Sequence, residues 1–473
     1  MKTILYLVTM LLTFSGCNKV DVGYFDLDPV HGEHIKEPER NEPASPGSPV
    51  YKIPEVKNEN DFTNKIHIDP TYSGGGSNGS IEKPFTSIND NFSKGIPSNT
   101  AFLIRRGTEL NEKIGRLANG TRLTDMIYKN NFIGAYGSGE MPVVGGMWIA
   151  AGTNGLTIRD IHFLAQSQQS TGHDAVIYMH NSRYFPTSSP ADLCRNVTIA
   201  YCIIEGKHNP SYYYDPTPYP LKGIKFDCDN FVLYHTEIRN IWSDGVYAGG
   251  GNGHSAVRNW IHKINLMDQR AKAENWPNPS SPDPRSDDSK STAWGKGGTG
   301  DCWQSGGAGN NYYFAGNIFD RSNSTWKFGL IMNNGLNSNN RGVIIEWNTF
   351  LAPLSGAGGG AHYYNMPPDN ICRYNLYDAS RPNSQSYVWI AGGLSVIKYH
   401  LTQAPPFGIR NNHVIKNKPG DRITWGTSNT DTDHYVHESN KIFNGLEEYK
   451  IFLQTNDPVG SDIDTENFWR DVR

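Results

Sequence analysis

Apolar residues along this chain come in short runs separated by Gly and Asn, without the 3.6-residue periodicity of a helix. Examples are Leu156–Phe163, Val197–Ile204 and Phe231–Ile238. Runs of this kind predict β-strands. Gly and Asn tolerate the left-handed backbone conformation that tight corners require. We therefore expect short strands that turn a corner every few residues.

The runs also repeat, and the repeat has two phases. The second phase recurs after 22 residues from Lys222 to Asp244 and after 26 residues from Asp301 to Lys327. A period in the twenties with two or three short strands per repeat indicates a solenoid. In such a fold, identical side chains on successive coils lie about 4.8 Å apart and hydrogen-bond along a column. The first phase supplies such a column: Asn259, Asn317, Asn348 and Asn375. The predicted fold is all-β, a parallel β-helix.

Composition narrows the function without naming it. The chain has 473 residues and 37% hydrophobic content, enough for one large domain. A net charge of −4 argues against nucleic-acid binding, which would need a basic stripe. An aromatic content of 12% suits stacking on sugar rings. Cysteines without CxxC spacing exclude a zinc site, and Cys202 and Cys302 fall in apolar runs, where we expect buried thiols.

The N-terminus carries a targeting pattern. Met1-Lys2 and the apolar run Ile4–Phe14 predict a secretory signal that is too short to span a membrane. Residues 1–17 end in Ser-Gly-Cys17, which resembles a bacterial lipobox and implies lipidation of Cys17. We therefore expect the protein to be lipid-anchored to the outer membrane, at the bacterial cell surface or in the periplasm. We also expect it to be a monomer. Residues 18–63, rich in Pro, Glu, Asp and Ser, predict a flexible tether.

Residues 64–473 are predicted to form a single β-helix domain that ends in a C-terminal capping segment. Its first part, Ile66–Ile88 with the Gly-rich stretch Gly74–Gly76, resembles secreted right-handed parallel β-helix proteins of the pectate-lyase-like superfamily. The segments Phe102–Gly107 and Ile133–Gly137 match the first coils of that superfamily. The resemblance spans roughly residues 64–415. It implies a right-handed coil and a short capping helix over residues 87–93 that covers the apolar end.

The second phase of the repeat aligns a column of charged positions, in coil order Asp174, Lys222, Asp244, Asp301, Lys327 and Ala361. Carboxylates about 5 Å apart on neighbouring coils raise the pKa of one of them, as a proton donor beside an ionised partner requires. The long loop 266–299 leaves the chain between Asp244 and Asp301 and is expected to overhang a groove there. The structural alternative is that an Asp before Gly at a turn bonds its own backbone.

Candidate site residues follow from this column. We expect the catalytic residues to be Asp244, Asp301, Lys327 and His254. Neighbouring positions on the same face, together with Arg side chains whose forks bind sulfate or carboxylate, are expected to bind substrate: Lys222, Lys225, Tyr247, Gln304, Arg258, Trp303 and Arg321.

The column resembles two families. Ser243-Asp244-Gly and Gly300-Asp301-Cys resemble polygalacturonase-type hydrolases, which implies Asp residues as acid and base. The chain departs from them, because it has one Asp where they have two in tandem and Lys327 where their His coil falls. Trp326-Lys327-Phe-Gly resembles the calcium-dependent pectate lyases, which implies Lys327 as base. Two aligned Asp are fewer than the six to eight oxygens that calcium prefers.

Three hypotheses remain from the sequence. The leading one is an endo-acting glycoside hydrolase that cleaves an acidic polysaccharide, bearing sulfate or uronate, with a pair of Asp carboxylates. The second is a calcium-dependent polysaccharide lyase, and calcium is the only cofactor that any hypothesis requires. The third is a glycan-binding surface protein without catalysis.

Overall fold

The chain divides into two compact units, residues 1–44 and 45–473. A computed structural model describes residues within the second unit: 51–92, 95–115, 127–165, 175–179, 194–206, 222–241, 243–264, 301–305, 310–322, 329–332, 342–352, 363–364, 371–381, 387–390, 394–395, 407–425 and 435–469. Among these residues, no helix is long and apolar enough to cross a membrane.

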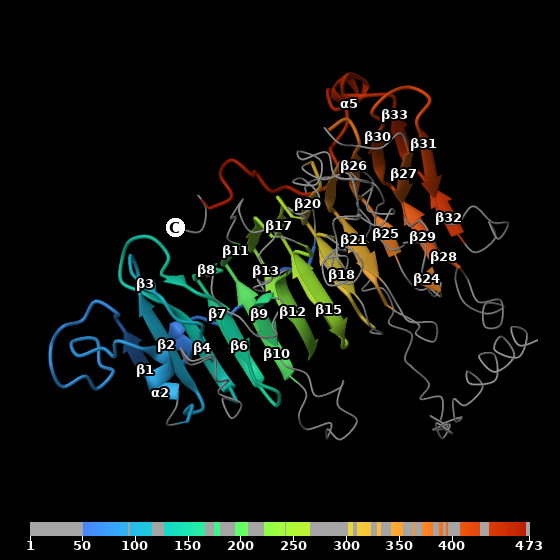
Figure 1. The fold of residues 1–473 in the computed structure, drawn as a ribbon. Coiled ribbons are helices and arrows are strands. Elements are labelled where there is room, and N and C mark those ends of the chain that lie inside the picture. Colours follow the sequence, from blue (N-terminus) through green and yellow to red (C-terminus); the bar gives the residue numbers. More distant parts are fainter. Residues whose placement is uncertain are drawn as a thin grey trace, which may run out of the picture. The chain divides into compact units, whose positions relative to one another are not determined.

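The strands of sheet A pair in parallel with the next coil along the chain (Figure 1). They are β1 (Asn64–Ile68), β2 (Thr100–Arg105), β4 (Lys129–Tyr136), β7 (Asn154–Arg159), β10 (Cys194–Ala200), β13 (Val232–Tyr234), β16 (Ser255–Val257), β19 (Tyr313–Ala315), β22 (Ile344–Glu346), β25 (Ile371–Arg373), β29 (Phe407–Arg410) and β32 (Tyr435–Glu438).

Within the described residues, sheet B has eleven strands, each of which follows a strand of sheet A in the chain. They are β3 (Glu109–Leu110), β5 (Val143–Val144), β8 (His162–Leu164), β11 (Ile203–Glu205), β14 (Glu237–Arg239), β17 (Trp260–Ile261), β20 (Ile318–Asp320), β23 (Thr349–Leu351), β26 (Leu376–Asp378), β30 (His413–Ile415) and β33 (Lys441–Phe443).

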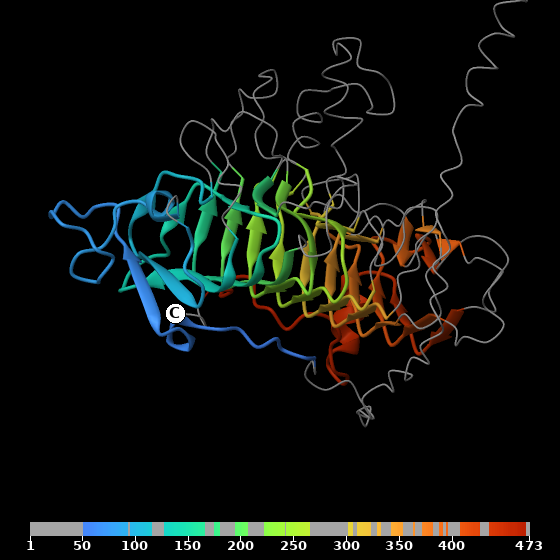
Figure 2. The same ribbon diagram turned by 90° about the horizontal axis from the view of Figure 1, so that it is seen from below.

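Sheet C is the third face of the coil. It adjoins sheet A where the backbone of β10 at Cys194 pairs with that of β12 at Cys228; both cysteines are free thiols. It contains β6 (Met147–Ile149), β9 (Ala175–Met179), β12 (Lys222–Asp229), β15 (Val246–Gly250), β18 (Trp303–Ser305) and β21 (Leu330–Met332). Two further parallel pairs are β24 (Tyr363–Tyr364) with β28 (Leu394–Ser395), and β27 (Tyr387–Ile390) with β31 (Arg422–Trp425). The predicted all-β parallel β-helix is confirmed, and Figure 2 shows the successive coils from a second direction.

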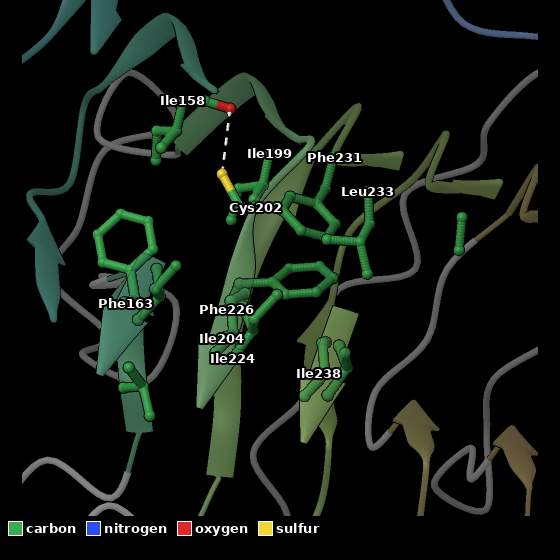
Figure 3. Close-up of a cluster of buried hydrophobic side chains, with 14 of the residues drawn as sticks. Ile158, Phe163, Ile199, Cys202, Ile204, Ile224, Phe226, Phe231, Leu233 and Ile238 are labelled. Atoms are coloured by element: carbon green, nitrogen blue, oxygen red, sulfur yellow. Dashed lines mark hydrogen bonds between the residues drawn. The ribbon is translucent and has the colours of Figure 1, made fainter. Parts of the chain in front are cut away.

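The interior is built from alternating strand residues. Ile177, Ile224, Val246 and Trp303 stand in one register row across sheet C and are all fully buried. Figure 3 shows how Phe226 and Phe231 meet Leu233 and Ile238 inside the coil. Burying such a side chain contributes about 1.5–3 kcal/mol. Cys202 and Cys302 are buried free thiols, as predicted, and burial raises the pKa of both.

The predicted Asn column is present at the corner between sheets A and B. The Nδ2 of Asn259 donates to Oδ1 of Asn317 at 2.9 Å, and Asn317 donates to Asn348 at the same distance. Asn348 then donates to Asn375 at 3.0 Å, and the column continues to residues 412 and 440. Buried amides that satisfy one another in this way remove a desolvation cost at every coil.

Both ends of the coil are covered. Helix α2 (Ile88–Phe92) confirms the predicted N-terminal capping helix, since Ile88 and Phe92 join the core and Phe92 packs edge-on against Phe102. At the other end, α5 (Leu446–Phe452) buries Tyr449 against Phe443. The resemblance seen in the sequence ends near residue 415, yet β32 and β33 add one more coil before α5.

Residues before and after the coils run along its surface (Figure 2). The N-terminal segment 51–63 includes the 3-10 helix η1 (Glu59–Asp61) and buries Phe62 against Phe132. Residues 51–63, which the sequence assigned to the tether, thus contact the coil, and residues 18–50 lie outside the described part. The C-terminal segment 459–469 returns over earlier coils, where Trp469 Nε1 donates to Glu237 Oε2 at 2.8 Å.

Candidate active face on sheet C

One row of side chains lies on the face of sheet C that points away from the interior of the coil, although its members Trp148 and Gln304 are only 1% and 5% exposed. Each member directly follows an inward-facing residue, and in a strand successive side chains point to opposite faces. The strand register sets the members opposite one another on neighbouring coils. We call them the sheet C row: Trp148, Tyr178, Lys225, Tyr247 and Gln304.

The row combines aromatic faces with a cation. Trp148 and Tyr178 stack with ring centroids 4.8 Å apart and planes at 16°. The Lys225 ammonium lies 5.6 Å from the ring centroid of Tyr178 and 5.8 Å from that of Tyr247. Cation–π attraction therefore holds Lys225 between two rings. Tyr178, Lys225 and Tyr247 are half-buried, so part of each faces solvent.

Gln304 ends the row with a polar group. The residue is 5% exposed, and its Oε1 has no hydrogen-bond partner in the described part of the chain. A buried polar atom without a partner is uncommon, because it costs the desolvation of that atom.

The predicted acid pair stands at the corner that leads into sheet C. Asp244 precedes β15 and Asp301 precedes β18, and the Asp301 backbone N–H donates to Asp244 Oδ1 at 3.0 Å. Lys222 Nζ lies 4.0 Å from Asp244 Oδ2 and 5.5 Å from the ring of Tyr247. The three side chains are neighbours on successive coils, as the repeat predicts, and Lys222 connects the acid pair to the row.

Burial of the acid pair differs from the prediction. Asp244 and Asp301 are fully buried, whereas the sequence placed them in solvent. They share strand parity with Val246 and Trp303, which point inward. Between them Gly245 donates its backbone N–H to the Asp301 carbonyl at 2.8 Å, and a Cβ on Gly245 would meet the Cys302 carbonyl at 2.6 Å. The coils therefore approach closely at this corner, and the two carboxylates lie beneath the surface.

Sequence reasoning missed Asp227. It follows Lys225 by two residues on β12, so both occupy the same face of sheet C. A Cβ added to Gly249 would come within 2.2 Å of the Asp227 carboxylate. The Asp227 side chain is buried, with 9% of the residue exposed. The pairing with β15 shifts between Phe226 and Asp227, as at a β-bulge, which is a frequent feature beside active sites. The alternation of polar residues at 225 and 227 is the signal that would have found it.

Two predicted substrate-binding residues are buried and do not belong to the sheet C row. Trp303 points into the coil, packs edge-on against Phe314, and donates Nε1–H to Ser305 Oγ at 3.1 Å. The prediction for Trp303 is therefore wrong, whereas Gln304, also predicted to bind substrate, lies in the sheet C row. Arg321 is 1% exposed and lies close enough to Cys302 to lower the pKa of a thiol that burial raises. Neither side chain reaches the outer face of sheet C.

His254 lies at the other end of β15 from Asp244. It is 1% exposed, stacks on Tyr312 at 4.6 Å, and its Nδ1 accepts from the Phe231 backbone N–H at 3.4 Å. The structure thus does not bring His254 together with the acid pair.

Arg258 follows β16 on sheet A. It donates Nη1–H to Asp462 Oδ2 at 2.7 Å and to the Tyr51 hydroxyl at 3.2 Å. It joins the two terminal segments and lies on a different sheet from Lys225, which is not the position predicted for a substrate contact.

Three sequence predictions fall on residues outside the described part of the chain: Lys327, Asp174 and Cys17. The described register also sets Lys222 opposite Ala175, one residue after the position that the repeat aligned with it. The long loop 266–299 also lies outside the described part, between β17 of sheet B and β18 of sheet C.

The described residues do not fit a calcium site at the acid pair. Calcium prefers six to eight oxygen ligands. The acid pair offers two carboxylates, and the Lys222 ammonium lies 4.0 Å from that of Asp244. Within the described ranges, no three His, Cys, Asp or Glu side chains are grouped in a way that could hold a metal ion.

No protein-family model and no curated protein matches this chain. Among solved structures, it is similar to a GH136 lacto-N-biosidase from Eubacterium ramulus, with 12% identity over 80% of this chain and 68% of that one and a TM-score of 0.42. The pectate lyase Pel9A has 10% identity over 80% of each chain and a TM-score of 0.38. A glycoside hydrolase has 7% identity over 86% of this chain and all of that one, with a TM-score of 0.44. At these values the similarity is confined to strand arrangement.

Proposed function

We propose that the protein is a carbohydrate-active enzyme that cleaves an acidic polysaccharide bound across the sheet C row. The observation that carries this proposal is the Lys225 ammonium between the rings of Tyr178 and Tyr247. Aromatic faces offer sugar rings a flat apolar platform, and an ammonium between them attracts a carboxylate or sulfate on the same sugar. Neighbouring coils are about 4.8 Å apart, so the row presents its side chains at regular intervals, as binding a polymer of repeating units requires.

We assign the cleavage step to the carboxyl pair at the edge of this row. Asp301 would donate a proton to the departing glycosidic oxygen, while Asp244 would accept a proton from the attacking water. The water oxygen then forms the new bond to the sugar carbon as the glycosidic bond breaks. Lys222, 4.0 Å from Asp244, balances the charge of that carboxylate and lies beside the sugar platform at Tyr247. This assignment gives hydrolysis.

The experiment is a panel of pectin, alginate, carrageenan, fucan and chondroitin sulfate, assayed for new reducing ends and for near-ultraviolet absorbance. Hydrolysis predicts reducing ends without absorbance. A lyase would give an absorbing double bond, and chelation would then test for calcium. Asp301→Asn and Asp244→Asn should each lower kcat at least about 100-fold. Polymer binding with no product from the wild type would contradict an enzyme and favour a glycan-binding protein.

A further inference from the structure

A cavity lies on sheet A, away from the sheet C row. Its volume is about 610 Å³. One wall is the N-terminal segment at Asn58–Asn60, and the rest comes from β1, β2, β4 and the end of β7. No residue of sheet C lines it. The cavity is therefore separate from the proposed active face.

Cationic groups outnumber anionic ones in this cavity. Lys65, Arg106 and Arg159 line it against Glu59 and Asp160, which leaves one formal positive charge with His67 counted as neutral. Arg106 Nη2 and Arg159 Nε lie 3.4 and 3.3 Å from the same oxygen, Asp160 Oδ2. One carboxylate is thus shared by two guanidinium forks. Within the described residues neither fork has a second carboxylate, so N–H donors remain for a ligand.

The other lining groups suit a sugar. The rings of Tyr136 and His67 meet edge to face at 4.9 Å, which gives the cavity an aromatic side. Lys65 Nζ contacts Asn60 Oδ1 at 3.3 Å and is otherwise exposed. Cations and an aromatic face in one cavity match an anionic sugar unit better than a neutral one, because a guanidinium fork binds carboxylate or sulfate with two parallel hydrogen bonds.

The cavity is already formed without a ligand. Its N-terminal wall is fixed on both sides, because Phe62 packs against Phe132 at 5.7 Å and Lys57 Nζ donates to Asn130 Oδ1 at 2.6 Å. A capping box at Asn58 and Asp61 shapes the turn between these anchors. A preformed wall lowers the ordering cost of binding.

We propose that this cavity is a second saccharide site, which binds an anionic sugar unit of the polymer that the enzyme cleaves. The polymer's identity rests on the proposed function, whereas the cavity's location and charge do not. Holding the polymer at a site remote from cleavage raises its effective concentration at the sheet C row. The expected signature is loss of polymer binding while turnover of short fragments stays intact.

The test is affinity electrophoresis of the full protein, in the cold, through gels that contain polygalacturonate, alginate, chondroitin sulfate or neutral dextran. Arg106→Gln/Arg159→Gln should weaken retardation by an acidic polymer about tenfold. Lys65→Gln, an exposed change that leaves Asp160 fully paired, should weaken it about threefold. Arg105→Gln is the control matched in charge to Lys65→Gln, since each removes one positive charge, but Arg105 pairs with Asp69 at 2.6 Å and does not line the cavity.

Equal retardation of the wild type and the double variant in every acidic gel would overturn the proposal. So would equal weakening in Arg105→Gln, which would indicate net charge alone, or loss of binding that extends to dextran. Melting temperatures of all variants exclude unfolding, and Lys65→Gln carries the test if the double variant unfolds. Cleavage of short fragments by the double variant tells the two proposals apart. If the wild type cleaves nothing yet only the double variant loses acidic-gel binding, the proposed function fails and this site stands.

Discussion

The ammonium of Lys222 lies 4.0 Å from Asp244 Oδ2, and both side chains are buried at the corner that leads into sheet C. This pair joins two coils, and its aromatic neighbour Tyr247 belongs to the proposed sugar platform. Removing one partner of a buried ion pair leaves the charge of the other partner uncompensated in the protein interior. Asp244 therefore contributes to the stability of the coil through Lys222 and is also one of the two carboxylates proposed to be catalytic.

Lys222→Met should lower the free energy of unfolding by about 3–5 kcal/mol, because it leaves the Asp244 carboxylate without its cation. Urea denaturation followed by circular dichroism measures this change. Lys450→Met is the control: Lys450 pairs with Glu447 at 2.7 Å on the exposed face of α5, where an ion pair contributes about 0–1 kcal/mol. Equal effects of the two substitutions would contradict a buried pair.

The Asn column should be sensitive at its centre. Asn348 accepts from the backbone N–H of Asn317 at 3.0 Å and from its Nδ2 at 2.9 Å. Asn348→Ala removes the acceptor of the Asn317 backbone N–H and of one of the two Nδ2 hydrogens, while Nδ2 still donates to the Ala256 carbonyl at 2.8 Å. Each lost acceptor costs about 1–3 kcal/mol. We expect a loss of about 2–5 kcal/mol in urea denaturation. Asn440→Ala, at the half-buried end of the column, should cost clearly less.

Arg258 should matter for stability and not for substrate. Its fork contacts Asp462 and Tyr51, and Asp462 is 204 residues away in the chain. Arg258→Gln should lower the free energy of unfolding by about 1–2 kcal/mol through the lost charged hydrogen bonds. KM for the polymer that the wild type cleaves should stay unchanged. A raised KM with an unchanged melting temperature would restore Arg258 to the substrate site.

The contacts of Glu205 on sheet B should make the stability of the fold sensitive to acid. Burial disfavours its charge, but hydrogen bonds from His162, Arg239 and Asn240 outweigh burial and lower its pKa to about 2. A depressed folded pKa stabilises the fold above the ordinary value near 4.5, and this stabilisation is lost as the pH falls towards 2. Between about pH 6 and pH 3, urea denaturation should show a smaller loss for Glu205→Gln than for the wild type. Parallel losses would contradict the shift.

Features that repeat on every coil could be predicted from the sequence, and features that depend on direction or on distant contacts could not. The Asn column and the neighbourhood of Lys222, Asp244 and Asp301 follow from spacing alone. Inward burial of the two Asp depends on strand parity at a bend, which spacing does not fix. The inward direction of Trp303, which was predicted to bind substrate, was missed for the same reason.

Contacts between distant segments leave no local pattern. The partner of Arg258 lies in the C-terminal segment, and the cavity beside Arg106 has a wall from residues predicted to be a tether. Asp227 was detectable from the alternation of β12, but its position beside Gly249 required the coordinates.

The most direct test of the central claim is the binding of polymer to Lys225→Gln, measured by affinity electrophoresis and by KM with the polysaccharide that the wild type cleaves. Lys441→Gln is the matched control, because Lys441 also lies over a ring, that of Phe452 at 4.2 Å, but on the last coil. If acidic sugars bind across the sheet C row, Lys225→Gln should bind about tenfold more weakly while Lys441→Gln binds as the wild type does. Unchanged binding and KM in Lys225→Gln would contradict the account.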